Sequence, residues 1–150
     1  MNLSPHFTLS ELTRTSRAQD NTPKQEHIAA LTRLCADVLE PIRALLGVPI
    51  RITSGYRSAA VNEAIGGAEG SQHLLGQAAD IVPVGYVGGV EAAMKVLAVE
   101  VRAGRLLTDQ VICYPVGAFI HVSCGPRNRR QLLRSAARGG SGGPYSIWAG

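Results

Sequence analysis

The ten residues from Ser71 to Asp80 place the strongest constraint on how this chain can fold. They carry a histidine, His73, and a carboxylate, Asp80, seven residues apart around a glycine. The residues from 78 to 84 alternate in a way that favours a short strand, with Asp80 on one of its two faces. Gly76 permits the turn that brings His73 back toward that strand. We therefore expect both side chains at one end of a rigid element.

A second histidine, His121, lies in another strand-like segment, Phe-Ile-His-Val-Ser at 119–123. Its apolar neighbours face the core, so the imidazole is expected to face away from it. Two imidazoles and one carboxylate from neighbouring strands fit a catalytic zinc site, which has three protein ligands and an open fourth position. The alternative is that His73 and Asp80 form a hydrogen-bonded pair that braces a turn.

The composition indicates one domain with a sizeable core. The chain has 150 residues, of which 45% are apolar and 17% charged. No apolar run approaches the roughly 20 residues that cross a bilayer. The N-terminus lacks a basic flank followed by an apolar run, so no secretory signal is expected. The chain would then stay in the cytoplasm until another route releases it.

A net charge of +4 is concentrated late in the chain. The late arginines are Arg127, Arg129, Arg130, Arg134 and Arg138. They suit a polyanionic partner, either nucleic acid or the anionic polymers of a bacterial wall, and the alternative is a solvated basic face. Only 5% of the residues are aromatic, and none interleaves with these arginines, so no nucleic-acid partner is expected.

The three cysteines predict neither a thiolate zinc site nor a disulfide framework, because they are widely spaced and form no C-x-x-C pair. Cys35 lies in a helical pattern and is interpreted as a small buried hydrophobic residue.

Periodicity and turn signals predict the remaining elements. A long amphipathic helix begins with Thr22 as its cap and Pro23 at its first position, and Pro41 should kink or divide it near Glu40 before it ends at Gly47. The other expected elements are a helical turn at 9–12, a strand at 48–53, a helix at 59–65, a loop at 66–70, a helix at 90–101 and a hairpin of strands 109–114 and 119–124. The domain is expected to span 1–138, followed by a glycine-rich flexible tail at 139–150.

Three further polar residues are candidates for the site. Arg57, at a strand end, is either a surface arginine or a cation that binds a substrate carboxylate or a developing oxyanion. Ser71 either caps the turn before His73 or donates to a substrate. Asp109, which opens the hairpin, is either a solvated carboxylate or the acid/base of a zinc site.

These residues resemble a known enzyme family. The pattern Ser71-x-His73-x-x-Gly76-x-Ala78-x-Asp80 resembles the S-x-H-x-x-G-x-A-x-D signature of the zinc D-alanyl-D-alanine carboxypeptidases. Their relatives include the vancomycin-resistance dipeptidases, the phage L-alanyl-D-glutamate endolysins and the hedgehog signalling domain. The segments 52–58, 109–112 and 119–123 resemble those that carry the family's active-site arginine and last zinc ligand. The residues from 4 to 12 resemble the compact members encoded by phages and prophages.

The resemblance implies an α+β fold with a small, mainly antiparallel sheet and packed helices. It implies that His73, Asp80 and His121 bind one Zn²⁺ and that Arg57 positions and polarises the substrate. Ser71 and Tyr114 are then expected to bind substrate. The implied reaction is hydrolysis of an amide bond in the peptide stem of peptidoglycan, by a monomer that is either released from the cytoplasm or associated with a virion.

The chain departs from the family pattern at the catalytic acid/base. Many relatives place an acidic residue three positions before the last histidine ligand, where this chain has Ala118. Other compact relatives carry a glutamate just after the D-Q-hydrophobic segment, where this chain has Cys113, Tyr114 and Pro115. The alternatives are that Asp109 transfers the proton, that Tyr114 contributes, or that the protein is catalytically weak.

Two functions of different classes follow from these observations. The first is a zinc peptidase that acts on cell-wall peptides, either as a carboxypeptidase or as an endopeptidase. The second is a binding or structural protein, for example a phage tail or wall-anchoring component, that keeps the fold without the chemistry. The missing acidic residue at position 118 favours the second.

Overall fold

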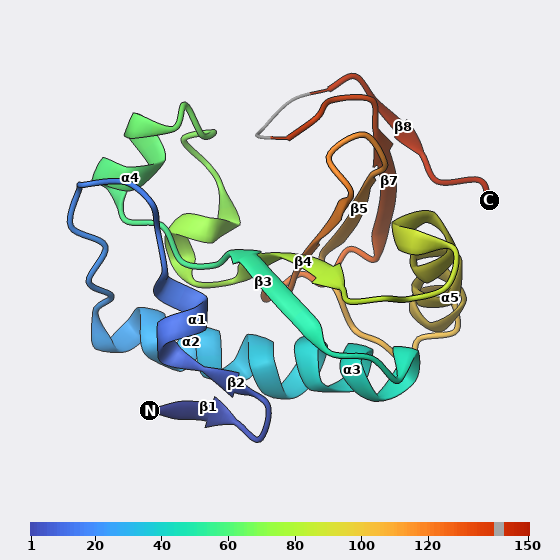
Figure 1. Ribbon diagram of the computed structural model, residues 1–150, viewed down its shortest axis with the longest axis horizontal. Coiled ribbons are helices and arrows are strands. Elements are labelled where there is room, and N and C mark those ends of the chain that lie inside the picture. Colours follow the sequence, from blue (N-terminus) through green and yellow to red (C-terminus); the bar gives the residue numbers. More distant parts are fainter. Residues whose placement is uncertain (140–142) are drawn as a thin grey trace.

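The computed structural model, which describes residues 1–139 and 143–150, is an α+β fold of helices packed against a sheet (Figure 1). This confirms the expected fold class. The helices are α1 (Leu9–Thr13), α2 (Gln25–Leu34), the π-helical turn η1 (Cys35–Leu39), α3 (Glu40–Leu46), α4 (Ala59–Ala64), the 3₁₀ turn η2 (Gln72–Leu75) and α5 (Gly89–Arg102). The strands are β1 (Asn2–Ser4), β2 (Phe7–Thr8), β3 (Ile50–Ser54), β4 (Ala78–Pro83), β5 (Gln110–Tyr114), β6 (Phe119–Ser123), β7 (Gln131–Ser135) and β8 (Tyr145–Ile147).

The main sheet has the strand order β3-β4-β6-β5-β7-β8. Every neighbouring pair is antiparallel except β5 and β7, which are parallel. The expected hairpin forms from β5 and β6, and its turn holds Ala118 at a φ of 57°. Strand β4 lies between β3 and β6, so hydrogen-bonded neighbours fix the position of Asp80 from both sides.

The central strands separate apolar from polar residues, as their alternation predicts. On one face Ile81, Ile120 and Val111 are buried in a core that also contains apolar side chains of α2, η1, α3 and α5. Each such side chain stabilises the fold by about 1.5–3 kcal/mol. On the other face Asp80 and His121 lie directly opposite each other in the β4–β6 pairing. Burial of the apolar face therefore fixes which polar residues share the other face.

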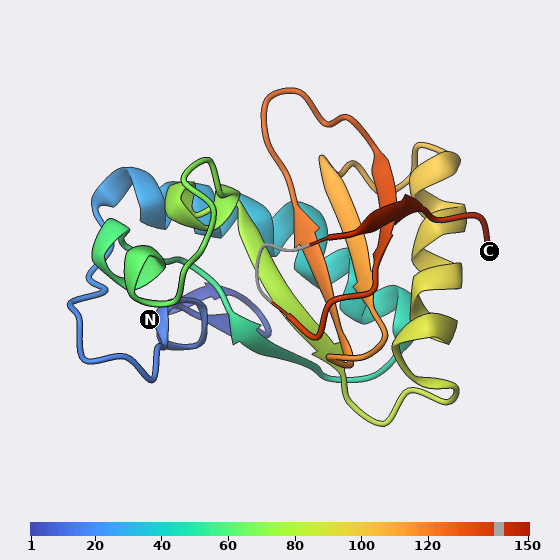
Figure 2. The same ribbon diagram turned by 90° about the horizontal axis from the view of Figure 1, so that it is seen from above.

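The long helix of the first half is divided into α2, η1 and α3 along one continuous path (Figure 2). Pro41 is at the second position of α3, where its missing N–H costs little, and the π-helical turn precedes it. The expected division near Glu40 is therefore confirmed. The expected start was wrong, because the cap is Lys24, whose N–H donates to His27 Nδ1 over 3.1 Å.

The N-terminal segment forms a small hairpin of β1 and β2 that the sequence did not predict, followed by the expected helical turn, α1. The hairpin is joined to α3 by Glu40, which accepts hydrogen bonds from the Ser4 hydroxyl at 2.6 Å and the His6 backbone N–H at 2.8 Å. The first residues are therefore part of the packed structure.

The C-terminal part differs from the expected flexible tail at 139–150. Residues 140–142 lie outside the described residues, but β8 pairs with β7 and extends the sheet past the expected boundary at 138. Trp148 is buried, its backbone N–H donates to Leu132 O over 3.0 Å, and its backbone carbonyl accepts from Arg102 Nη2 over 2.9 Å. Pairing of the strand and burial of the indole explain why this glycine-rich region ends in ordered structure.

All three cysteines are buried and free, including Cys35, as expected. Burial raises the pKa of the Cys35 thiol to about 12 and those of Cys113 and Cys124 to about 11. Among the described residues, no helix is long and apolar enough to cross a membrane.

Candidate metal centre and cleft

The first candidate ligand, His73, lies on the short turn η2. Ser71 caps this turn, because its hydroxyl accepts the His73 N–H over 3.2 Å. Gly76 ends it at a φ of 71°, and a Cβ there would lie 2.8 Å from His27 O, so the position requires glycine on both counts. The turn leads directly into β4, which carries Asp80. Local capping and one glycine thus bring His73 to the strand, as the sequence predicts.

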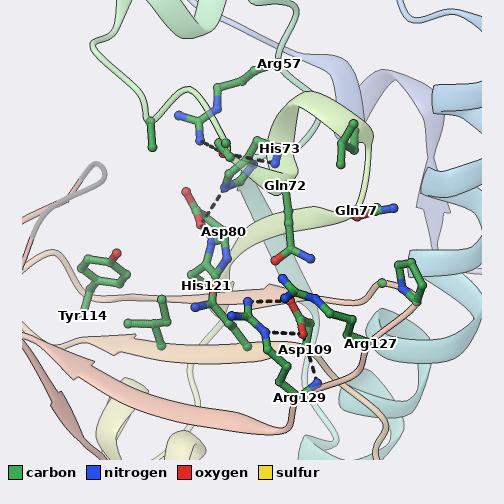
Figure 3. Close-up of a pocket in the computed structure, with 18 of the residues that line it drawn as sticks. Arg57, Gln72, His73, Gln77, Asp80, Asp109, Tyr114, His121, Arg127 and Arg129 are labelled. Carbon is green, nitrogen blue, oxygen red and sulfur yellow. Dashed lines mark hydrogen bonds and ion pairs between the residues drawn. The ribbon is translucent and has the colours of Figure 1, made fainter.

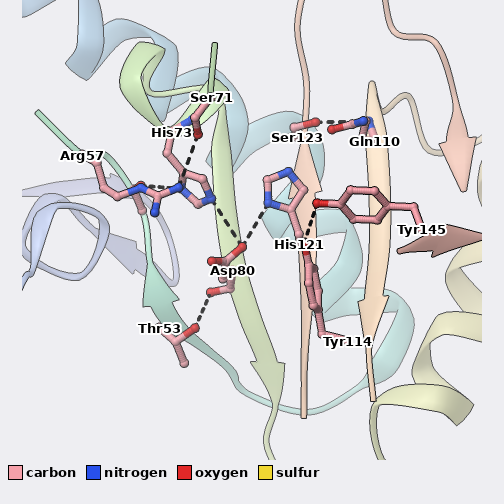
Figure 4. Close-up of polar contacts among 11 residues, drawn as sticks. Thr53, Arg57, Ser71, His73, Asp80, Gln110, Tyr114, His121, Ser123 and Tyr145 are labelled. Atoms are coloured by element: carbon pink, nitrogen blue, oxygen red, sulfur yellow. Dashed lines mark hydrogen bonds and ion pairs between the residues drawn. The ribbon is translucent and has the colours of Figure 1, made fainter. Parts of the chain in front are cut away.

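The three candidate ligands converge on one point (Figure 4). Asp80 Oδ1 lies 3.4 Å from His73 Nε2 and 3.0 Å from His121 Nδ1. The ligand atoms of the three residues all lie within 4.8 Å of one another. Two imidazole nitrogens and one carboxylate oxygen are a donor set that suits zinc. Among the described residues no other His, Cys, Asp or Glu joins this cluster.

A backbone carbonyl orients the buried His73 ring. Its Nδ1 donates to Gly55 O over 2.7 Å, which leaves Nε2 as the nitrogen that faces Asp80. This pattern, in which the second ring nitrogen is held by an outer partner, is typical of metal-binding histidines.

The charge states of the cluster also suit metal binding. Burial lowers the pKa of His73, while the charge of Asp80 acts in the opposite direction. Burial alone would raise the pKa of Asp80, but the adjacent His73 and His121 hold it below its ordinary value. An ionised carboxylate and a neutral imidazole are the forms that coordinate a metal ion.

Arg57 lies beside the cluster, between β3 and α4 (Figure 4). Its backbone N–H donates to His73 O over 3.0 Å, and its Nη2 donates to the Ser71 hydroxyl over 3.3 Å. Burial lowers the pKa of Arg57, and the charge of Asp80 opposes this effect. Its Nε is buried with no hydrogen-bond partner among the described residues. The structure thus brings Arg57 and Ser71 together with the three candidate ligands.

These residues line a cleft of about 530 Å³ on the polar face of the sheet (Figure 3). Its walls also carry the polar side chains of Gln72, Gln77, Asp109, Tyr114, Arg127 and Arg129. A cleft of this size accommodates several residues of a peptide or a comparable small molecule.

A family model described as Peptidase M15 matches residues 5–123 of this chain. The chain belongs to the peptidase M15 family. This family consists of zinc-dependent metallopeptidases. No curated protein matches the chain. The matched segment ends with β6, so β7 and β8 of this M15 chain lie outside it.

Asp109 lies in the cleft, but its carboxylate is held by Arg129. It accepts the Arg129 Nε at 2.8 Å, its Nη2 at 2.8 Å and its backbone N–H at 3.0 Å. These bonds lower the pKa of Asp109 to about 2. An efficient general base has a pKa nearer the working pH, so this geometry disfavours the acid/base role expected for Asp109.

Tyr114 occupies the polar face of β5 and stacks on Phe119, with ring centroids 4.4 Å apart. Its hydroxyl lies 3.4 Å from that of Tyr145, on β8. Burial raises the pKa of Tyr114, so the phenol keeps its proton near neutral pH and remains a hydrogen-bond donor. Ala118 is exposed in the neighbouring hairpin turn and brings no carboxylate to the cleft.

Sequence reasoning assigned neither Arg127 nor Arg129 to the cleft, and it missed Tyr145, whose hydroxyl lies beside that of Tyr114. Arg129 reaches Asp109 because β7 runs parallel to β5, a long-range pairing that no local pattern predicts. The available signal was the arginine cluster that directly follows the strand of His121. Tyr145 follows a glycine-rich run that predicts a flexible tail, so no role was assigned to it from the sequence.

Proposed function

We propose that this chain is a zinc peptidase that hydrolyses an amide bond in peptidoglycan stem peptides, with one zinc ion held by His73, Asp80 and His121. The observation that carries the proposal is the convergence of three ligand atoms within 4.8 Å at the cleft, beside a half-buried arginine. The resemblance of the N-terminal segment to compact phage enzymes supports a role in lysis of the bacterial wall.

Zinc bound at such a site polarises the scissile carbonyl and makes a water molecule nucleophilic near neutral pH. Arg57 binds a carboxylate of the substrate or the oxygen that becomes negative during attack, and Ser71 holds its guanidinium. Tyr114 donates a hydrogen bond to the same developing charge, because its phenol stays protonated. Arg57 follows β3 and Tyr114 ends β5, so these two donors come from different elements of the cleft wall.

Asp109 has a positioning role in this proposal. Its ion pair with Arg129 joins the start of β5 to the loop that precedes β7. The carboxylate is nearly fully buried, at 3% side-chain exposure, so the pair is better shielded from water than a surface ion pair. Asp109 therefore shapes the wall of the cleft.

The test is mass spectrometry of defined stem peptides after incubation with the zinc-loaded protein, with Asp80→Ala as the control. We expect an amide bond to be cut by the natural chain, and we expect no cleavage and weakened zinc binding in the variant. Loss of a terminal D-alanine would identify a carboxypeptidase, and internal cleavage an endopeptidase. Intact peptides in the presence of a protein that binds one zinc ion would refute the proposal.

A second candidate function is a wall-binding protein that lacks turnover. It is favoured by the carboxylates of the cleft, which among the described residues are those of Asp80 and Asp109, both already engaged. Cosedimentation with purified peptidoglycan distinguishes the two. Binding that persists through long incubation without release of peptides would support this second function.

A further inference from the structure

A second arginine, Arg127, lies in the cleft at a distance from Arg57, with the ligand cluster between them (Figure 3). It belongs to the loop between β6 and β7, beyond the segment that matches the M15 family model. Among the described residues, its side chain makes no hydrogen bond or ion pair. Its neighbours Arg129 and Arg134 are paired with Asp109 and Glu91. Arg127 is thus a positively charged side chain of the cleft without a partner among the described residues.

The loop that carries Arg127 is fixed at several points. At its start the Cys124 N–H donates to Gln77 O over 2.9 Å, and at its end the Arg130 N–H donates to Thr108 O over 3.0 Å. Between them Arg129 holds Asp109 through its backbone and its side chain. An anchored loop keeps the base of Arg127 at a constant place in the cleft, as a residue that recognises a ligand requires.

Positive side chains outnumber negative ones in the cleft, so we expect an anionic ligand near Arg127. Asp109 is neutralised by Arg129, and Asp80 is engaged by both histidines of the ligand cluster. Arg57 pairs with a neutral hydroxyl, that of Ser71. The cleft thus has three arginines and two carboxylates among the described residues, and Arg127 is the arginine that no carboxylate neutralises.

We propose that Arg127 binds a carboxylate of the substrate on the opposite side of the scissile bond from the group that Arg57 binds. A guanidinium and a carboxylate form paired, charge-assisted hydrogen bonds, which neither the amides nor the hydroxyls of the cleft reproduce. The site then selects stem peptides that carry an internal carboxylate in addition to the group recognised by Arg57. This inference rests on the proposed peptidase function.

The experiment compares two synthetic stem peptides that differ at one internal group, a free carboxylate in one and a carboxamide in the other. Cleavage rates and dissociation constants are measured for the zinc-loaded natural chain, for Arg127→Gln and for Arg127→Lys. Arg130→Gln is the matched control, because it removes the same charge from the same loop outside the cleft. Zinc content and thermal stability establish that each variant is folded.

We expect the natural chain and Arg130→Gln to prefer the carboxylate peptide by about tenfold in kcat/KM and in affinity. Arg127→Gln should lose this preference by weakening the carboxylate peptide alone, and Arg127→Lys should keep part of it. A preference that survives in Arg127→Gln, or an equal loss for both peptides, overturns the assignment while the peptidase function stands. If no peptide is cut, the peptidase proposal fails, and the ratio of the two dissociation constants still decides the role of Arg127.

Discussion

The hydroxyl of Tyr114 is a single group whose contribution to the reaction can be isolated. We expect Tyr114→Phe to lower kcat/KM by about 100-fold, because it removes one donor to the developing negative charge. The ring and its stacking on Phe119 remain, so zinc content and thermal stability should not change. The measurement is steady-state cleavage of a defined stem peptide.

Tyr145→Phe is the control for this prediction. It removes the hydroxyl 3.4 Å from that of Tyr114 but leaves the Tyr114 donor in place. We expect a smaller loss of activity, within about tenfold. Full activity in Tyr114→Phe would exclude the phenol from the reaction.

Asp109 makes the free energy of unfolding depend on pH in the acid range. Its folded pKa of about 2 lies below the ordinary value of 3.8, so its contribution is complete above pH 4 and disappears as the pH falls toward 2. After allowance for the partial exposure of Arg129, this contribution is about 1–2 kcal/mol. Asp109→Asn should be less stable than the natural chain at pH 6, and the difference should shrink below pH 4.

Urea unfolding of both proteins between pH 2 and pH 6 tests this expectation. Other carboxylates titrate in both proteins, so the difference between the two curves reports Asp109. Two curves separated by a constant amount at every pH would show that the ion pair does not titrate in this range.

The candidate ligands could be predicted from sequence because their signal is local. His73 and Asp80 flank one turn and one strand, and His121 lies in an alternating segment that pairs with that strand. The engagement of Asp109 could not be predicted, because its partner Arg129 is twenty residues away in sequence and reaches it through tertiary structure.

At the scale of elements, the contact between α1 and the end of β3 supports the metal centre. A Cβ at Gly55 would lie 2.3 Å from Leu12 O, and Gly55 O accepts the hydrogen bond that orients His73. Gly55→Ala must separate these segments, so we expect a loss of about 1–3 kcal/mol in stability. We also expect zinc affinity to fall about 10–100-fold, as for other losses of an outer partner.

Zinc titration and thermal unfolding of Gly55→Ala and Gly70→Ala provide the comparison. A Cβ at Gly70 meets no atom within 4 Å, so this variant should behave like the natural chain. Unchanged zinc affinity in Gly55→Ala would show that the His73 ring does not depend on this carbonyl.

Elements with a strong local pattern agree with prediction, and those defined by distant partners do not. Strand β4, the β5–β6 hairpin and α5 follow from alternation, turn residues and helical spacing. Strand β7 contains the polar residues Gln131 and Arg134 and gains its stability from parallel pairing with β5. Local reasoning therefore assigned that part of the chain to a basic surface.

At the scale of the whole molecule, the main sheet is completed by β7 and β8 from the C-terminal end of the sequence, while β1 and β2 form a separate small sheet. The M15 match covers the elements that hold the candidate ligands, while Arg129, in the loop before β7, and Tyr145, on β8, lie beyond it. The cleft is therefore larger than the ligand motif, and its far wall belongs to the part of the chain that the motif does not describe.

Substitution of Trp148 tests whether the C-terminal segment is an integral part of the fold. The indole is 3% exposed in the main core, and the Arg134 guanidinium lies 5.5 Å from its ring centre. Trp148→Ala should cost about 3–5 kcal/mol in the free energy of unfolding, because it opens a large cavity. Trp148→Phe should lose less, since it keeps an aromatic ring and removes an indole N–H that has no partner among the described residues. Urea unfolding followed by far-UV circular dichroism measures both, and equal stability of Trp148→Ala and the natural chain would restore the interpretation of this segment as a flexible tail.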